Sequence, residues 1–241
     1  MLKSAGSRTP TDGGERNRLL RALPSVELRS LRPDLEHIEL AHGDVMHAPR
    51  ELIPFALFPE AGVASVLAVD NAGVGVEVVS VGNEGMVGMS LVHDIASSPH
   101  LCIIQVAGHG KRIRGPALAR QLPDLPVLQR LLGRYATAMF NEAAQTILCN
   151  RRHSIDERCA RWLLMTDDRV SGEDFALKQE FLSYMLAARR PSVSRAAARL
   201  QRDGLIRYSR GVIRVLDRAG LEAAACECYT ITRAANDRLH D

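Results

Sequence analysis

Arginine and serine side chains at the start of one predicted helix have the chemistry to recognise nucleic acid bases. They lie in the stretch "AARRPSVSRAAARLQRDG" at 187–204. An arginine can donate two parallel hydrogen bonds to O6 and N7 of guanine, and a serine hydroxyl can bond to a base or a phosphate. The residues that we expect to read bases are Arg189, Arg190, Ser192, Ser194 and Arg195. A basic helix face that only contacts solvent is the alternative.

The elements around this stretch predict how those side chains are positioned. Pro191 suits the first turn of a helix, where its missing N–H costs nothing, and Gly204 is a typical helix stop. A shorter helix at 179–186 precedes it across a tight turn, and "LIRYSRGVIRVLD" predicts two short strands around a turn at 209–211. Two helices, a short turn and a hairpin form a winged helix-turn-helix, whose second helix enters the major groove of DNA.

Polar and basic residues beside the predicted reading helix are suited to phosphates, which fix register without reading sequence. These predicted backbone contacts are Lys178, Gln179, Arg207, Tyr208 and Arg210. Residues 178–218 include ten basic and only three acidic residues, although the whole chain has a formal net charge of only +3. The rest of the chain is therefore net acidic, and the basic segment alone predicts a polyanionic partner.

The N-terminal half has a different periodicity. Residues 35–115 contain alternating or short apolar runs such as "GVGVEVVSVG" and "LCIIQVAG", separated by glycine-bearing turns. Several short strands at near-regular intervals predict a small antiparallel roll or sandwich, so the fold class is α+β. We expect a disordered lead-in at 1–18, a β-roll sensing domain at 19–125, a long helix at 126–152, and the DNA-binding domain at 153–241.

Apolar residues of the predicted long helix recur at steps of three and four. The stripe consists of Leu128, Leu132, Tyr135, Met139 and Ala143. A helix this long between two domains needs a partner for its stripe, and its own copy across a two-fold axis is the simplest one. We therefore predict a dimer interface there. The stripe could instead pack on its own roll, and both contacts could exist on different faces.

Little else in the sequence indicates chemistry. The five cysteines are scattered, which is typical of reduced thiols in the cytoplasm. Cys226-Glu227-Cys228 is tighter than the C-x₂-C spacing of zinc knuckles, so we expect ordinary thiols there, with a redox or metal-sensing pair as the alternative. The histidines show no compact ligand spacing. We expect no metal, no cofactor, no catalytic residues and no membrane-spanning segment.

The segment "QEFLSYMLAARRPSVSRAAARLQRDGLI" and the hairpin "YSRGVIRVLD" resemble the Crp/Fnr family of bacterial transcription regulators. The order of the predicted elements matches that of the family over nearly all of residues 19–217. It implies a cyclic-nucleotide-binding-like jelly roll, a dimerisation helix and a winged helix-turn-helix. It also implies a homodimer that binds a palindromic double-stranded DNA operator under control of an effector, with RNA polymerase as a further candidate partner.

Departures from the family pattern narrow these expectations. Pro191 stands where relatives often carry an acid that reads cytosine. Met89 follows Gly88 where cyclic-nucleotide binders have glutamate, and Pro99-His100 lies near their arginine. No cysteine precedes Cys102, unlike in iron–sulfur members. We therefore expect an effector other than a cyclic nucleotide, at a site the sequence does not identify. A constitutive DNA-binding regulator with a structural roll, or a small-molecule enzyme with a basic appendage, are the alternatives.

Overall fold

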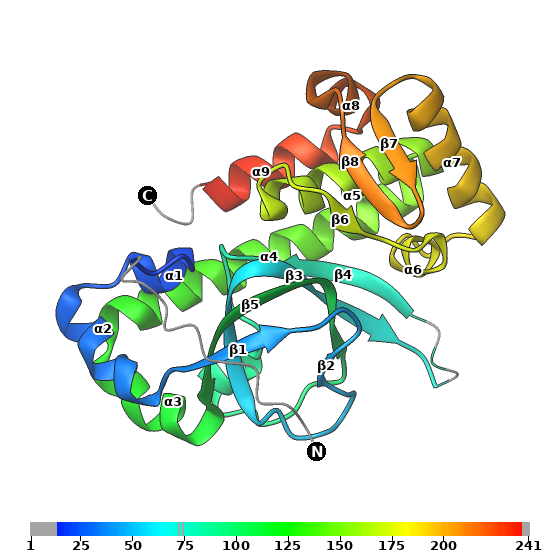
Figure 1. Ribbon diagram of the computed structural model, residues 1–241. Helices are drawn as coiled ribbons and strands as arrows, with labels where there is room; N and C mark the ends of the chain where they lie inside the picture. The colour runs from blue at the N-terminus through cyan, green and yellow to red at the C-terminus, as the bar shows by residue number, and fades with distance from the viewer. Residues whose placement is uncertain (1–13, 72, 74, 238–241) are drawn as a thin grey trace, which may run out of the picture.

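The computed structural model describes residues 14–71, 73 and 75–237, arranged as two halves on either side of a long helix (Figure 1). The helix is α4, Pro126–Arg152. A β-roll lies along one side of it, and the C-terminal helices with a small second sheet lie along the other. The predicted α+β fold class is confirmed. None of the described helices is both long and apolar enough to cross a membrane.

The roll is an antiparallel sheet in the order β1-β5-β3-β4, with β2 added to β5. Its strands are β1 (Glu36–Leu40), β2 (Val45–His47), β3 (Phe55–Val69), β4 (Gly75–Val81) and β5 (Leu101–Arg114). The long strands β3 and β5 pair from Phe55 opposite Arg114 to Leu67 opposite Leu101, with register shifts between 59 and 64. These bulges bend the two strands and let the sheet curl.

Short helices lie at one end of the roll, beside the first turns of α4 (Figure 1). They are α1 (Arg18–Arg21), α2 (Ser25–Leu31) and α3 (Gly115–Gln121), with 3-10 turns at Arg32–Asp34, Met89–His93 and Leu122–Asp124. Asn17 is fully buried, accepts hydrogen bonds from the N–H groups of Leu19 and Leu20, and donates to the carbonyls of Pro59 and Gly85. The predicted disordered lead-in is therefore wrong for residues 14–18, while residues 1–13 lie outside the described chain.

The apolar stripe of α4 packs on the roll of its own chain. Leu128 and Leu132 are 0% exposed and Tyr135 is 2% exposed, and Met139 and Ala143 pack against the same core. The prediction that this stripe forms the dimer interface is corrected, because the stripe completes the hydrophobic core of the roll. The intramolecular alternative is the one observed.

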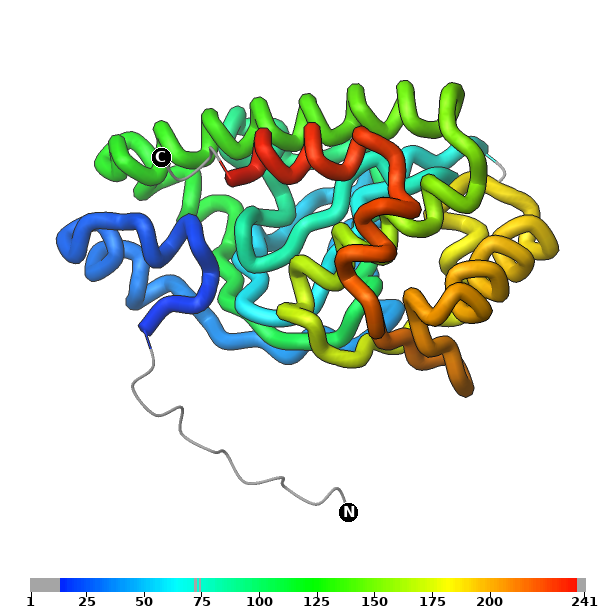
Figure 2. Tube along the Cα trace, turned by 90° about the horizontal axis from the view of Figure 1, so that it is seen from above, coloured from blue at the N-terminus to red at the C-terminus, as the bar shows by residue number. Residues whose placement is uncertain are grey.

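The C-terminal half follows α4 without a long linker. Its helices are α5 (Ile155–Val170), α6 (Gln179–Met185), α7 (Arg190–Arg202), α8 (Arg218–Ala224) and α9 (Cys228–Asp237). Its sheet has the order β6-β8-β7, from β6 (Phe175–Ala176), β7 (Ile206–Ser209) and β8 (Val212–Val215). Ser154 and Glu157 form a capping box at the start of α5. The last helix, α9, returns along α4 (Figure 2).

Candidate nucleic-acid interface

Helix α7, the helix expected to read bases, is held by its apolar side and presents its start to solvent. Val193, Ala196, Ala197 and Leu200 are buried between α7 and the rest of the domain. Arg189 is the N-cap, and Pro191 lies in the first turn as predicted. Between α6 and α7 the chain turns at Ala187, whose φ of 44° lies in the left-handed region. The predicted order of helix, tight turn, helix and hairpin is confirmed.

The five predicted base-reading residues lie together at the start of α7 but differ in exposure. Arg189, Arg190 and Arg195 are exposed, whereas Ser192 and Ser194 are half-buried. Ser194 Oγ donates a hydrogen bond to Gln179 Oε1 at 2.6 Å, which ties α7 to α6. Arg195 Nη2 donates to Ser192 Oγ at 3.3 Å. The arginines therefore have the greater freedom to reach a base, and Ser194 has a positioning role in this structure.

Most of the predicted phosphate contacts surround one hollow between α6, α7 and the hairpin. The hollow has a volume of about 370 Å³ and is lined by Lys178, Gln179, Glu180, Arg190, Tyr208, Arg210 and Gly211. Arg210 and Gly211 both have positive φ, 51° and 78°, which is typical of the tight hairpin turn that matches strand twist. The turn places the Arg210 cation beside Arg190 and Lys178. Arg190, expected to read bases, thus also lines the hollow that the expected phosphate contacts surround.

Besides Gln179, two more of the expected phosphate contacts are engaged within the protein. Tyr208 Oη donates its only hydrogen to the carbonyl of Leu177 at 2.7 Å, so the ring anchors the hairpin to the segment before α6. Arg207 lies 3.9 Å from Asp174, which also accepts a hydrogen bond from Arg214. No pattern in the sequence indicates these pairings, because Asp174 lies on a different element.

Other arginines of the basic segment have structural partners. Arg199 Nη2 donates to both carboxylate oxygens of Asp156 at 2.5 and 2.6 Å, joining α7 to α5. Arg218 forms ion pairs with Asp167 at 2.6 Å and with Asp168. The exposed arginines outside these ion pairs include Arg189, Arg190 and Arg195 at the start of α7 and Arg210 at the hollow.

The reading end of the domain lies against the roll. Tyr184 Oη in α6 donates a hydrogen bond to the carbonyl of Gly73 at 3.0 Å, and the rings of Phe181 and His42 meet edge to face at 5.6 Å. A hollow of about 790 Å³ lies at this junction, and Arg189 is among the residues that line it. The roll therefore contacts the helix that precedes the reading helix.

A buried ionic network joins the roll, α4 and α5. Arg169 of α5 donates to Glu84 at 2.8 Å, to the carbonyl of Ser80 at 3.0 Å and to Glu142 of α4 at 3.3 Å. Glu142 in turn accepts the N–H of Ser80 at 3.0 Å. Burial disfavours the Arg169 cation, but Glu84 and Glu142 outweigh it, so the pKa of Arg169 is raised. These side chains connect the two halves through charge rather than through apolar packing alone.

A second polar connection involves the lone tryptophan. Trp162 is buried, and its Nε1–H donates to Glu77 Oε2 at 3.1 Å. Burial raises the pKa of the Glu77 carboxyl. Nearby, Gln105 of β5 donates to Thr166 of α5 at 3.2 Å. No pattern in the sequence indicates these contacts between α5 and the roll.

Comparison with known proteins agrees with this architecture. Residues 157–224 match the family model of the Crp-like helix-turn-helix domain. A search of curated protein sequences found no match. Among solved structures, a putative Crp/Fnr family transcriptional regulator from Eubacterium rectale is 17% identical with a TM-score of 0.65, covering 89% of this chain and 97% of its own.

Two further structures show the same likeness. A Crp/Fnr family transcriptional regulator from Thermus thermophilus is 20% identical with a TM-score of 0.62, over 79% of this chain and 98% of its own. The c-di-GMP responsive global regulator CLP from Xanthomonas campestris is 13% identical with a TM-score of 0.64, over 80% of this chain and 99% of its own. The chain therefore has the fold of the Crp/Fnr regulators. More particularly, its C-terminal half contains a Crp-like helix-turn-helix domain.

Proposed function

We propose that the protein is a homodimeric, sequence-specific DNA-binding regulator of bacterial transcription that acts in the cytoplasm. The observation that carries this proposal is the start of α7. Three exposed arginines (Arg189, Arg190 and Arg195) lie there beside a basic hollow, within a domain that matches the Crp-like helix-turn-helix model. This arrangement suits base readout by the helix and phosphate contacts by its surroundings. RNA polymerase is a further candidate partner.

The outer face of α4 supports a dimer. Phe140 and Ile147 are each 72% exposed, although both are large and apolar. Together with Gly133, Thr137 and Ala144 they recur at alternating steps of four and three, the spacing of a two-helix coiled-coil seam. Leu148 beside them is also exposed. We assign the dimer interface to this face, opposite the stripe that the sequence indicated, with a second copy of α4 as its occupant.

The dimer would place two reading helices on one operator. Two half-sites of a palindrome lie roughly 34 Å apart, one turn of DNA, so the two copies of α7 must match that spacing. Helix α4 has 27 residues and is therefore about 40 Å long. A long seam of this kind holds the two DNA-binding halves in a fixed relation, and a signal that shifts the relation changes affinity.

We propose that the signal acting on the roll is an effector other than a cyclic nucleotide. In the segment 88–100, which covers the positions where cyclic-nucleotide binders carry their acid and arginine, there is no arginine or lysine to pair with a cyclic phosphate. The roll interior also favours the second candidate, a constitutive regulator with a structural roll, because Phe58, Met86 and Ile104 are each 0% exposed in its core.

Selection of genomic DNA tests the proposal. Purified protein would be mixed with sheared bacterial DNA, and the bound fragments sequenced at two salt concentrations. We expect fragments that share a palindromic sequence, and a dimer by light scattering. Fragments without a common sequence at either salt concentration would contradict sequence-specific binding. Protein refolded from denaturant, and so stripped of ligand, would then bind equally well if the roll is structural and differently if it holds an effector.

A further inference from the structure

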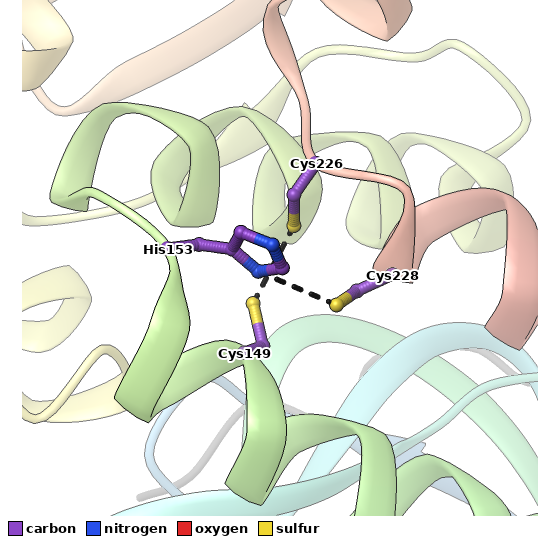
Figure 3. Close-up of side chains that lie close together, drawn as sticks. All are labelled: Cys149, His153, Cys226 and Cys228. Atoms are coloured by element: carbon purple, nitrogen blue, oxygen red, sulfur yellow. Dashed lines mark hydrogen bonds between the residues drawn. The ribbon is translucent and has the colours of Figure 1, made fainter.

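Four potential metal ligands that are far apart in the sequence converge at the end of α4 (Figure 3). Cys149 and His153 lie four residues apart, at the last turn of α4 and immediately after it. Cys226 lies between α8 and α9, and Cys228 is the first residue of α9. One ligand atom from each residue lies within 4.8 Å of the other three.

We propose that Cys149, His153, Cys226 and Cys228 bind one Zn²⁺ ion in a tetrahedral Cys₃His site. Cys149 Sγ lies 3.5 Å from Cys226 Sγ, and Cys228 Sγ lies 3.5 Å from His153 Nδ1. A tetrahedral zinc ion has Zn–S bonds of about 2.3 Å and Zn–N bonds of about 2.0 Å, which separates its ligand atoms by roughly 3.5–3.8 Å. The side chains are therefore already spaced to surround one small ion.

The ligand types favour zinc over harder cations. Three sulfur atoms and one imidazole nitrogen suit a soft or borderline tetrahedral ion, whereas magnesium and calcium require oxygen ligands. The three thiols form a buried cluster of their own, with Cys149 at 1%, Cys226 at 3% and Cys228 at 0% exposure. A set of four protein ligands leaves no open position, which is typical of structural rather than catalytic zinc.

Neighbouring groups orient the ligands as they do in known zinc sites. The second ring nitrogen of His153, Nε2, lies 3.4 Å from Glu227 Oε1, so Nδ1 is the nitrogen that faces the thiols. A carboxylate on the far nitrogen fixes the tautomer of a metal-bound histidine and raises its basicity. Gln145 Nε2 donates to Cys228 Sγ at 3.0 Å, a contact that stabilises a thiolate.

Positive charge compensates the thiolates. Two arginines of α5, Arg158 and Arg161, line the same small cavity as Cys149, and the Nε of each is buried with no hydrogen-bond partner among the described residues. Three thiolates and one Zn²⁺ ion carry a net charge of −1, which these cations can balance.

An occupied site would fasten α9 to α4 at the junction between the two halves of the chain. His153 directly precedes Ser154, which caps α5, and α9 packs along α4 in both views. The ion would therefore fix the direction in which the DNA-binding half leaves the long helix. The zinc site stands on its own geometry, and only this consequence for DNA rests on the proposed function.

Metal analysis of the full-length protein tests the site. Protein purified with a thiol reductant from zinc-supplemented cells would be analysed for metal per chain. It would then be stripped with a chelator and titrated with Co²⁺, whose tetrahedral thiolate complexes absorb visible light. We expect one zinc per chain, and cobalt bands typical of tetrahedral coordination by three thiolates. Cys149→Ser, Cys228→Ser and His153→Gln should each lose the ion or change those bands.

Matched controls separate the site from general thiol effects. Cys102→Ala and Cys159→Ala replace buried thiols outside the cluster and should keep one zinc per chain. Glu227→Gln should keep the stoichiometry while weakening metal affinity at least about tenfold, because it removes the carboxylate on His153. Absence of tetrahedral cobalt bands in folded protein would overturn the proposal. So would a Cys149–Cys226 disulfide as the state of the purified protein, or equal metal loss in the cluster and control variants.

Discussion

Arg169 of α5 and Glu84, which lies just after β4, form a buried ion pair whose Nε···Oε1 distance is 2.8 Å. Both side chains are less than 10% exposed, and Arg169 also reaches Glu142 of α4. One guanidinium thus contacts the roll, the long helix and the DNA-binding half at once. Because an unpaired buried charge is costly, a change in the position of any one of these elements must be accommodated by the other two.

Removing the Arg169 cation should therefore destabilise the whole protein. Arg169→Met leaves Glu84 and Glu142 buried without their counter-ion, and breaking a buried pair in this way typically costs about 3–5 kcal/mol. The free energy of unfolding, measured by urea denaturation, should fall by that amount. Arg130→Met, which removes an exposed arginine of α4, should change it by less than about 0.5 kcal/mol. Equal effects of the two variants would show that the network does not join the halves.

The exposed face of α4 gives a prediction about assembly. The double variant Phe140→Glu with Ile147→Glu places charge in the proposed seam, where two copies would bury four carboxylates. We expect monomers by sedimentation equilibrium at concentrations where the wild type is dimeric. Val45→Glu with Leu52→Glu is the control, because those residues are also large, apolar and exposed but lie outside α4. A dimer that survives the seam substitutions would refute this interface.

The contact between α6 and the roll predicts a restraint on DNA binding. Tyr184→Phe removes the hydrogen bond to the Gly73 carbonyl, worth about 0.5–1.5 kcal/mol. If this contact stabilises a position of α7 that is unfavourable for DNA binding, the affinity of the variant for the selected operator should rise about 2- to 10-fold. Tyr208→Phe removes a comparable bond within the DNA-binding half and should not raise affinity. Fluorescence anisotropy measures both, and unchanged or weaker binding by Tyr184→Phe would show that the contact is passive.

The DNA-binding domain could be predicted from the sequence because its signals are local. Pro191 at the start of α7, Gly204 after its end and the Arg210-Gly211 turn each determine nearby backbone, and all three lie as predicted. An apolar stripe on a helix, in contrast, indicates that one face of the helix is buried, but it does not identify the element that packs against that face. The stripe through Leu132 was therefore assigned to a second copy, although the chain's own roll covers it.

The cysteine cluster could not be predicted for a related reason. Cys149 and Cys226 are 77 residues apart, and only the return of α9 along α4 brings them together. The spacing of Cys226-Glu227-Cys228 does not match a local zinc motif, so the sequence predicts a pair of ordinary thiols there. Local spacing cannot reveal ligands that come from another element, such as α4. The partners of Arg169 were missed in the same way, since Glu84 lies 85 residues before it.

The central claim is that α7 reads bases while its surroundings hold phosphates, and the comparison of Arg195→Ala with Lys178→Ala tests it most directly. Affinities for the selected operator and for a scrambled duplex would be measured over a range of salt concentrations. Arg195→Ala should weaken operator binding by about 5- to 150-fold, or about 1–3 kcal/mol, with little effect on the scrambled duplex. Lys178→Ala should weaken both duplexes alike and lower the salt slope by about one. Equal losses on both duplexes for both variants would contradict the account.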